Sequence, residues 1–448
     1  MNKKEVLIIG GGFAGLSAGV ELASRGHQVT LIERKGHLGG RAYSYRDPIT
    51  GSTLDNGQHI LMGCYRETIS FLEKIGTLNK ISFQRNLAVD FAGIGTRAAR
   101  FQSLPLPNPF HLLTGFLFFR GLTWKDKKSA LRLGRLFAKG GLSEEALSDL
   151  DRLSVREWLL REGQTQRIQE RFWDPLTYAA LNDRPEVSSA ALLYTVIKEA
   201  LFSGKKAARI GLPKVGLSEL YTDAARDFIE RKGGHFLLKS PVLRLHFQGR
   251  EFHEVELEGG RRLSAENLLV TVPFTVLRKI LPDWMLYEDP FFSPLSALTS
   301  SPIVAINLWF DREFLHRPFV GLWGTQVHWI FNKGRLFREG PNYLSLVISG
   351  AREELQTPGP QLIEIALKEL YAIFPEAANA KLLRSMVTKE PEATLAPAVG
   401  SSRLRLPQKT PYRNLFLAGD WTDTGLPATI ESAVRSAKRA VDLIEVQE

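Results

Sequence analysis

A glycine-rich segment near the start of the chain has the residue types and spacing that hold a nucleotide pyrophosphate. Residues 10–15 read Gly-Gly-Gly-Phe-Ala-Gly and fit G-x-G-x-x-G, and Glu33 ends the next apolar segment. Gly10 permits a tight turn, Gly12 lets the backbone approach the phosphates, and Gly15 lets a helix pack on the preceding strand. Because the Glu33 carboxylate accepts hydrogen bonds from a ribose and repels a 2′-phosphate, the pattern predicts a dinucleotide other than NADP.

Two further segments indicate which dinucleotide is bound. Glu33-Arg34 is followed by Gly39-Gly40-Arg41, and residues 414–420 read Asn-Leu-Phe-Leu-Ala-Gly-Asp. With these segments the chain resembles the superfamily of FAD-dependent amine oxidases and carotenoid desaturases. The resemblance implies FAD, and non-covalent binding is expected because the one cysteine, Cys64, is far in sequence from the second of these segments.

The resemblance also assigns roles within this expected FAD site. The residue that matches Asp420 hydrogen-bonds the ribityl or phosphate part of FAD, and the backbone at Val242 meets the adenine. The helix after Pro427 is expected to direct its N-terminus at the N1–C2=O edge of the flavin, where the reduced form is anionic. No second G-x-G-x-x-G is present, so no NAD(P)H domain is expected. The expected cofactor-binding residues are Gly10, Gly12, Phe13, Ala14, Gly15, Glu33, Arg34, Gly40, Arg41, Gly57, Gln58, His59, Val242, Gly419, Asp420, Thr429 and Ile430.

More particular motifs narrow the resemblance to one branch. They are Asp55–His59 (DNGQH), Trp173–Leu176 (WDPL), Ala179–Asn182 (AALN), and the pair Gly419–Thr422 (GDWT) and Gly425–Ala433 (GLPATIESA). This combination is similar to that of the bacterial hydroxysqualene dehydroxylases of squalene and hopanoid synthesis. The resemblance implies that an allylic C30 alcohol is reduced to squalene, with hydride delivered from N5 of reduced flavin while water leaves.

Hydroxide is a poor leaving group, so this chemistry calls for an acid. His59 is the first candidate, because its position is expected beside the flavin and its ordinary pKa suits proton donation. The alternative is that His59 caps a turn or bonds the cofactor. Asp174 is a second candidate, with helix capping or pairing with an arginine as its alternative. An allylic cation favours aromatic walls, and the expected tunnel residues are Trp173, Tyr178, Trp309 and Trp329.

Other functions remain open at this stage. A desaturase acting on a linear polyene such as phytoene or dehydrosqualene would carry the same FAD motifs. An amine oxidase would need an aromatic cage at the flavin, which the sequence does not place. A non-enzymatic carrier of prenyl lipids, like the Rab GDP-dissociation inhibitors, shares the architecture without FAD, and the presence of both Glu33 and Asp420 argues against it. No metal site is expected.

The elements around the motifs predict an α/β fold. A strand over Glu5–Ile9, a helix over Phe13–Ser24 and a strand over Gln28–Glu33 form a βαβ unit. Segments near both ends of the chain fit one domain, so we expect a discontinuous Rossmann-like FAD-binding domain over residues 1–64, 206–282 and 396–448. A mixed α+β substrate domain is expected over 65–205 and 283–395, with its mostly helical, membrane-facing part over 65–205 and a second sheet over 283–395.

The charge distribution predicts a membrane contact. The chain has 448 residues and a net charge of +10, and residues 97–139 hold nine basic residues against one acidic residue. Phe110, Phe116–Phe119 and Trp124 lie in the same stretch, so residues 105–139 are expected to bind an anionic membrane peripherally, with an internal helix pair as the alternative. Apolar residues interrupt the basic cluster, which argues against nucleic acid.

No apolar run is long enough to span a bilayer. The single cysteine and the lack of a signal-peptide pattern predict a cytoplasmic protein on the inner face of the cytoplasmic membrane. The expected partners are a hydrophobic C30 isoprenoid, a reductant, and squalene-synthase-like enzymes of the same pathway.

Overall fold

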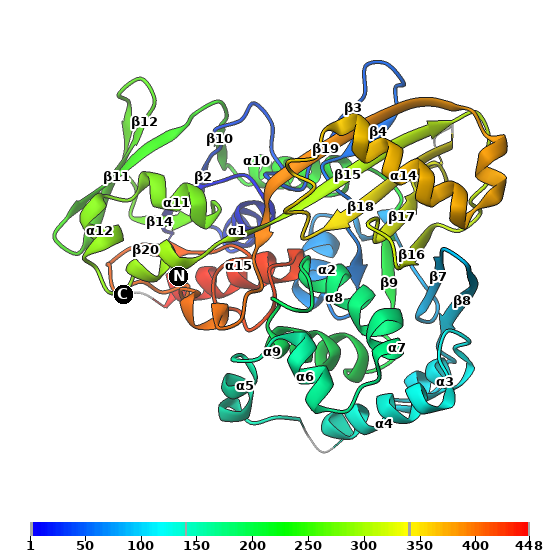
Figure 1. The fold of residues 1–448 in the computed structure, drawn as a ribbon. Coiled ribbons are helices and arrows are strands. Elements are labelled where there is room, and N and C mark those ends of the chain that lie inside the picture. Colours follow the sequence, from blue (N-terminus) through cyan, green and yellow to red (C-terminus); the bar gives the residue numbers. More distant parts are fainter. Residues whose placement is uncertain (1–2, 139–140, 339–341, 447–448) are drawn as a thin grey trace.

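A computed structural model describes residues 3–138, 141–338 and 342–446 of the chain. Its elements form two large sheets and a helical region (Figure 1). Lys139, which belongs to the predicted basic stretch, lies outside the described residues.

A parallel sheet holds the glycine-rich segment. Its strand order is β10-β2-β1-β14-β20. The bounds are β1 Glu5–Ile9, β2 Gln28–Ile32, β10 His235–Leu237, β14 Asn267–Val270 and β20 Leu415–Leu417. These strands come from stretches far apart in sequence, and α15 (Ile430–Glu445) returns the end of the chain to pack on α1 (Phe13–Ser24). An α/β fold is therefore confirmed, including the βαβ unit at the start.

Alternate residues of β1 face opposite layers. Val6 and Ile8 join a core with α1, α10 (Asp223–Arg231) and α15, whereas Leu7 and Ile9 join a core beneath α11 (Phe274–Ile280) and the hairpin β11–β12. This sheet is buried on both faces, which explains the nearly continuous apolar sequence of β1.

A second sheet forms the upper right of Figure 1, in the order β19-β15-β18-β17-β16-β7-β8. Its bounds are β7 Ala88–Gly93, β8 Thr96–Gln102, β15 Ser300–Phe310, β16 Phe319–Trp323, β17 Trp329–Asn332, β18 Asn342–Ser349 and β19 Leu382–Leu395. Helix α14 (Gly359–Ile373) covers one face through a core that includes Val304, Ile306 and Leu308. The opposite face contributes Trp329, Phe331 and Val347 to the core shared with the helical region.

The region 65–205 is helical with an exception that the sequence analysis missed. Strands β6 (Ile81–Phe83), β7 and β8 lie within it, and β7 pairs in parallel with β16 from the later part of the chain. The strand β19 was also missed, because its sequence LLRSMVTKEPEATL mixes charges with a proline. It is an edge strand that pairs with β15, where a proline is tolerated.

The remaining elements connect these layers. The helices are α2 Arg66–Lys74, α3 Phe110–Phe118, α4 Trp124–Ala138, α5 Glu144–Leu150, α6 Val155–Arg161, α7 Gln166–Ile168, α8 Asp174–Leu181, α9 Ala190–Val196, α12 Asp283–Tyr287 and α13 Lys333–Phe337. The π-helical segments are η2 Gln169–Trp173, η3 Ile197–Phe202 and η4 Ser218–Thr222, and the 3-10 turns are η1 Leu78–Lys80, η5 Ser293–Ala297, η6 Pro375–Asn379 and η7 Ser401–Leu404. The strands are β3 Ser44–Arg46, β4 Thr53–Asp55, β5 Leu61–Met62, β9 Ile210–Pro213, β11 Val242–Gln248, β12 Glu251–Leu257 and β13 Arg262–Leu263.

Candidate active site

A long groove runs over the ends of the parallel strands, beside the start of α1. A Cβ atom on Gly15 would lie 1.9 Å from the carbonyl oxygen of Gly10, so this close helix–strand approach requires glycine. No side chain caps the N-terminus of α1 within the described residues. Its first N–H groups therefore remain available to an anion in the groove.

Glu33 lies at the bottom of this groove and is buried. Its Oε2 accepts a hydrogen bond from the Gly11 N–H at 2.8 Å, and its Oε1 accepts one from the Lys35 N–H at 2.9 Å. Each carboxylate oxygen has a second lone pair. The backbone thus fixes Glu33 in place while leaving both oxygens able to accept from ribose hydroxyls.

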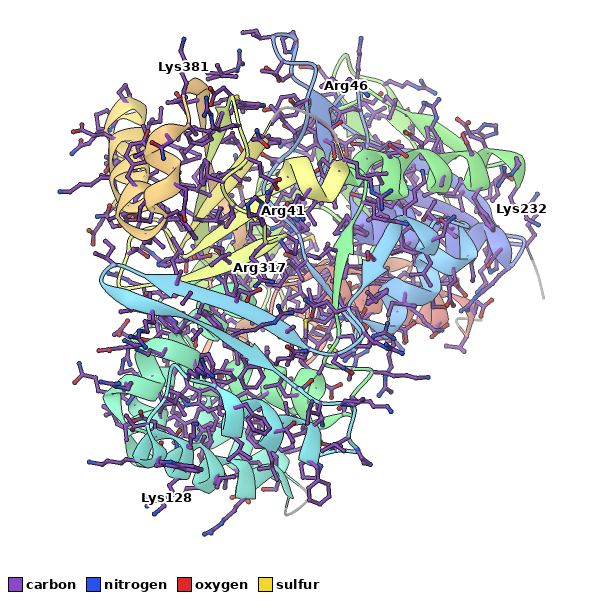
Figure 2. The ribbon with its side chains drawn as sticks, turned by 90° about the vertical axis from the view of Figure 1, so that its right-hand side faces the viewer. Arg41, Arg46, Lys128, Lys232, Arg317 and Lys381 are labelled. Atoms are coloured by element: carbon purple, nitrogen blue, oxygen red, sulfur yellow. The ribbon has the colours of Figure 1, made fainter. Side chains whose placement is uncertain are left out.

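Asp420 and Arg41 meet across the groove. Arg41 Nη2 donates to Asp420 Oδ1 at 2.5 Å, and Arg41 Nη1 donates to the Ala393 carbonyl at 3.1 Å. Figure 2 shows Arg41 near the middle of the molecule. A cation beside the start of α1 suits the phosphates of a dinucleotide.

Arg405 supports the C-terminal motif through hydrogen bonds to its backbone carbonyls. It is buried, and its guanidinium donates to the carbonyls of Asp420 at 2.6 Å, Trp421 at 3.2 Å and Leu426. Burial lowers the pKa of Arg405 to about 10, which leaves it charged at neutral pH. No sequence motif pointed to this residue, which positions both Asp420 and the turn before Thr429.

Most of the predicted cofactor residues line the groove. They are Gly10, Gly12, Phe13, Ala14, Glu33, Arg34, Gly40, Arg41, His59, Val242, Gly419, Asp420, Thr429 and Ile430. Gly15 packs against the strand instead, and Gly57 and Gln58 lie outside the lining. The β19 residues Glu390 and Thr394 also line the groove, and the sequence did not indicate them because β19 was not recognised. Asn56, which belongs to the motif Asp55–His59, lines the groove as well.

A buried ion pair supports the loop that carries His59. Lys333 Nζ lies 2.5 Å from Asp55 Oδ2 and 2.7 Å from Gln58 Oε1, and both charged side chains are almost inaccessible. The ammonium also lies 3.8 Å from the centre of the Phe337 ring. Gln58 therefore points toward Lys333 rather than toward the groove, which corrects its expected cofactor contact.

His59 lies in the groove lining with its Nδ1 at 3.1 Å from the Gly57 carbonyl oxygen. Burial, as the largest cause, lowers the pKa of His59, with the nearby Lys333 and Arg41 charges acting in the same direction. The neutral ring with Nδ1–H donating to Gly57 leaves Nε2 as an acceptor. This geometry favours the bonding role of His59 over the role of proton donor.

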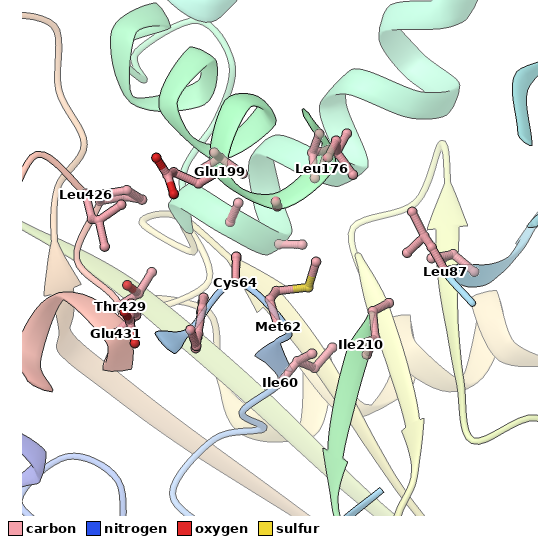
Figure 3. Close-up of a pocket in the computed structure, with 18 of the residues that line it drawn as sticks. Ile60, Met62, Cys64, Leu87, Leu176, Glu199, Ile210, Leu426, Thr429 and Glu431 are labelled. Atoms are coloured by element: carbon pink, nitrogen blue, oxygen red, sulfur yellow. The ribbon is translucent and has the colours of Figure 1, made fainter. Parts of the chain in front are cut away.

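An apolar cavity lies beside the groove. Thr429 lines both spaces, and the neighbours His59 and Ile60 line the groove and the cavity respectively. Figure 3 shows Leu426, Thr429, Glu431 and Glu199 on one side of the cavity and Leu87 on the other. The far part is lined by side chains without charge: Leu87, Val89, Phe91, Phe101, Phe172, Phe319 and Trp329.

Polar side chains gather where the cavity approaches the groove. Tyr65 lines the cavity and hydrogen-bonds with Thr429, and burial raises its pKa well above the ordinary value. Cys64 also lines the cavity, and burial raises the pKa of its thiol to about 12. At neutral pH both groups are therefore protonated.

The predicted aromatic tunnel is only partly found. Trp329 lines the cavity, but Trp173, Tyr178 and Trp309 do not. Trp173 donates to Gln164 Oε1 at 3.0 Å, and Tyr178 stacks on His328 with ring centroids 3.7 Å apart. Trp309 stacks on Tyr343 and donates to Ser52, which makes it ordinary core.

Asp174 also lies outside the cavity lining. Its Oδ2 accepts from Arg156 Nη2 at 2.9 Å, although burial, as the largest cause, raises the pKa of the carboxyl. The arginine partner of Asp174 is therefore Arg156 of α6. The structure places Asp174 in an ion pair with Arg156, outside the lining of both the groove and the cavity.

Comparison with known proteins decides the family. The family model described as flavin containing amine oxidoreductase matches residues 13–444. The chain belongs to this family. It is a FAD-binding oxidoreductase, and the groove fits FAD: open N–H groups at the start of α1, Glu33 for the ribose, and Arg41 beside the phosphate position.

Individual relatives are more specific. The chain is 27% identical to the hydroxysqualene dehydroxylase of Zymomonas mobilis over 97% of this chain and 98% of that protein. It is 29% identical to the hydroxysqualene dehydroxylase of Rhodopseudomonas palustris over 98% of both. It is also 25% identical to the 15-cis-phytoene desaturase of Solanum lycopersicum, over 98% of this chain and 77% of the relative. Among solved structures, an oxidoreductase from Methanosarcina mazei has the same fold, with a TM-score of 0.77 at 16% identity over 98% of this chain and 100% of that one.

Proposed function

We propose that this flavoprotein reduces an allylic C30 alcohol, hydroxysqualene, to squalene. The observation that carries the proposal is the apolar cavity, which shares Thr429 with the dinucleotide groove and has Tyr65 hydrogen-bonded to Thr429 at this shared edge. A long hydrocarbon substrate fits the apolar lining because burying its surface is favourable. The full-length similarity to two hydroxysqualene dehydroxylases supports the same substrate.

The polar end of the cavity favours an alcohol over a hydrocarbon polyene. A polyene offers no group for Tyr65 and Thr429 to bind, whereas a substrate hydroxyl accepts from the Tyr65 O–H through its oxygen and donates its own O–H to the neutral His59 Nε2. A site built to hydrogen-bond a substrate hydroxyl discriminates against analogues that lack it. This is why the dehydroxylation is proposed ahead of desaturation.

Bound and reduced, FAD supplies the two electrons and the hydrogen that replace the hydroxyl group. The residues of this chain do the rest. Arg41, Asp420 and Glu33 hold the cofactor, while the α15 N-terminus beside Thr429 stabilises negative charge there. Tyr65, Thr429 and His59 orient the hydroxyl, and the aromatic and aliphatic walls exclude water.

The test is a single turnover of purified holoenzyme under anaerobic conditions. Pre-reduced enzyme mixed with hydroxysqualene is expected to regain the absorbance of oxidised flavin, with squalene appearing in equal amount by mass spectrometry. If hydroxysqualene has no effect and phytoene or dehydrosqualene instead bleaches oxidised enzyme while gaining a double bond, the protein is a desaturase.

We also propose that α3 and α4 bind the membrane from which this substrate comes. Phe118 is 64% exposed and Trp124 67% exposed, and the cations Arg120, Lys125, Lys128, Arg132 and Arg135 lie on the same two helices and their connection. Lys128 extends from the outer edge of this region in Figure 2. Apolar anchors beside cations suit an interface with anionic lipid. Among the described helices none is long and apolar enough to cross a membrane.

This surface also lies close to the cavity. Phe116 of α3 packs on Phe101 and Phe172, at 5.3 and 4.7 Å between ring centroids, and both of these line the far part of the cavity. Helix α3 is thus one side chain away from the cavity wall. A lipid substrate entering from the membrane would have a short path.

Vesicle binding tests this contact. Phe118→Ser with Trp124→Ser is expected to weaken sedimentation with vesicles of phosphatidylglycerol and phosphatidylcholine, because two apolar anchors are lost. Phe119 is not suitable for the test, because it is fully buried. Leu160→Ser, at a 60% exposed position on α6, is the matched control. Equal binding by the double variant and the control rejects this docking site.

A further inference from the structure

The cavity has a charged wall whose chemistry the proposed binding site does not use. Among the described residues, the charged side chains in its lining are Glu199, Glu431 and Arg435. Figure 3 shows the two glutamates on the same side of the cavity as Thr429. Charged groups in an apolar lining are costly unless they have a function or a partner.

Two of the three also border solvent. Glu199 and Arg435 line a second, polar pocket on the outer side, together with Arg66, Glu67, Lys438, Arg439 and Asp442. Glu199 and Arg435 are thus shared between the apolar cavity and the polar pocket. These two side chains form the partition between the substrate space and water.

Glu431 has a structural role in this wall. Its carboxylate accepts from the Glu67 N–H at 3.2 Å, from the Thr68 N–H at 3.0 Å and from the Thr68 hydroxyl at 2.8 Å, which caps the start of α2. Arg435 Nη2 lies 3.5 Å from Oε1 of the same carboxylate, the oxygen that also accepts from the Glu67 N–H. Glu431 therefore fixes Arg435 and is itself fully engaged.

Glu199 differs from Glu431 because its carboxylate has no hydrogen-bond partners of this kind among the described residues. Its carboxylate makes no hydrogen bond or ion pair with any residue that the structure describes, and the side chain is only half-buried. It lies on η3, the π-helical continuation of α9. A π-helical turn is energetically poorer than an α-helical one and recurs at functional sites.

We propose that Glu199, beside Arg435, is a proton and water gate between the polar pocket and the substrate cavity. The inference rests on the proposed dehydroxylation. When a C–O bond is replaced by a C–H bond, the departing hydroxyl takes up one proton and leaves as water. An otherwise dry cavity must therefore admit a proton and release a water molecule in every turnover, and Glu199 can exchange protons on both sides of the wall.

Both acidic and basic groups surround Glu199. They come from the loop and helix around Cys64, Arg66 and Glu67, and from the α15 residues Glu431, Arg435, Lys438, Arg439 and Asp442. Because a carboxyl takes up and releases protons, removing it from this wall should change the pH dependence of turnover, and not only its rate.

The experiment compares Glu199→Gln with Glu67→Gln in pre-reduced holoenzyme. Glu67 lines the polar pocket but not the cavity, so its variant makes the same chemical change on the solvent side alone. Glu199→Gln is expected to slow flavin reoxidation by hydroxysqualene by about tenfold or more. It should also alter the pH profile and the solvent deuterium isotope effect, with flavin content and melting temperature unchanged. Glu199→Asp should recover part of the rate.

A second readout needs no turnover. Cys64 is the one cysteine of the chain and lies in the cavity wall near Glu199, so its modification by a small water-soluble thiol reagent reports on the gate. Glu199→Ala is expected to speed this modification, whereas Glu67→Ala is not. The gate is overturned if the wild-type enzyme turns over hydroxysqualene and Glu199→Gln has the same rate and the same pH profile. If the wild-type enzyme itself does not turn over hydroxysqualene, the proposed function is overturned instead.

Discussion

The dinucleotide groove and the apolar cavity meet at Thr429, yet they are assembled in different ways. The groove is lined mainly by short contiguous motifs, residues 10–15, 33–41 and 419–420. In these motifs backbone atoms provide many of the groups that bind the dinucleotide. The cavity takes single side chains from many elements, from Ile60 to Arg435. Backbone recognition of phosphate needs particular glycines at particular spacings, whereas an apolar wall needs only bulk.

This difference predicts how each region responds to mutation. A motif built from backbone atoms tolerates no added atom, whereas a wall of side chains tolerates substitutions at a graded cost. The loop that carries His59 lies between the two regions, and Lys333 at the start of α13 anchors it. The following variants test this contrast, from the largest expected effect to the smallest.

Gly15→Ala should have the largest effect. The new Cβ would lie 1.9 Å from the Gly10 carbonyl oxygen, so α1 must move away from the strand that forms the pyrophosphate site. We expect loss of bound flavin and a fall in unfolding free energy of about 3 kcal/mol or more. Absorbance of the purified protein measures the first and urea unfolding the second. Gly134→Ala, on α4 with open space around it, is the control and should keep its flavin.

Lys333→Met should be nearly as harmful. It leaves the buried Asp55 carboxylate without its ammonium partner, which costs about 3–5 kcal/mol. Thermal and urea unfolding of the purified protein measure the loss. The double variant Lys333→Met with Asp55→Leu should recover much of the stability. A single variant as stable as the wild type would show that the pair does not anchor this loop.

Two tryptophans separate cavity wall from core. Trp309→Ala should lower the unfolding free energy by about 3–5 kcal/mol, because it empties a packed site, without changing substrate preference. Trp329→Ala faces an existing cavity, so it should cost less stability and raise the KM for the C30 substrate. The ratio of the KM for the C30 alcohol to the KM for shorter alcohols, measured in each variant, distinguishes the cavity-wall residue from the core residue. Similar KM changes in both variants would contradict the assignment.

The smallest effect is a pH dependence at His328, which lies outside both regions. Burial lowers the pKa of His328 to about 4, while the unfolded chain titrates near the ordinary value of 6.5. Between these values the unfolded state binds more protons, so stability is complete above pH 6.5 and falls as the pH drops toward 4. We expect a loss of about 1 kcal/mol between pH 7 and 5.5 that His328→Gln removes. Urea unfolding at both pH values measures it, and an unchanged slope in the variant would exclude His328 as its source.

The sequence by itself determined the FAD site, because a phosphate-binding turn is local and its glycines are visible in order. It also determined the βαβ unit at the start of the chain, whose strands are short apolar runs beside the glycine-rich motif. The tertiary structure alone decided which residues share the cavity. Trp329 lines it while Trp309 does not, since the pleat and the pairing of β15 with β18 and β19 turn Trp309 toward Tyr343 and Ser52. The partners of Asp55 and Asp174, Lys333 and Arg156, were likewise set by packing between distant segments, which no local pattern records.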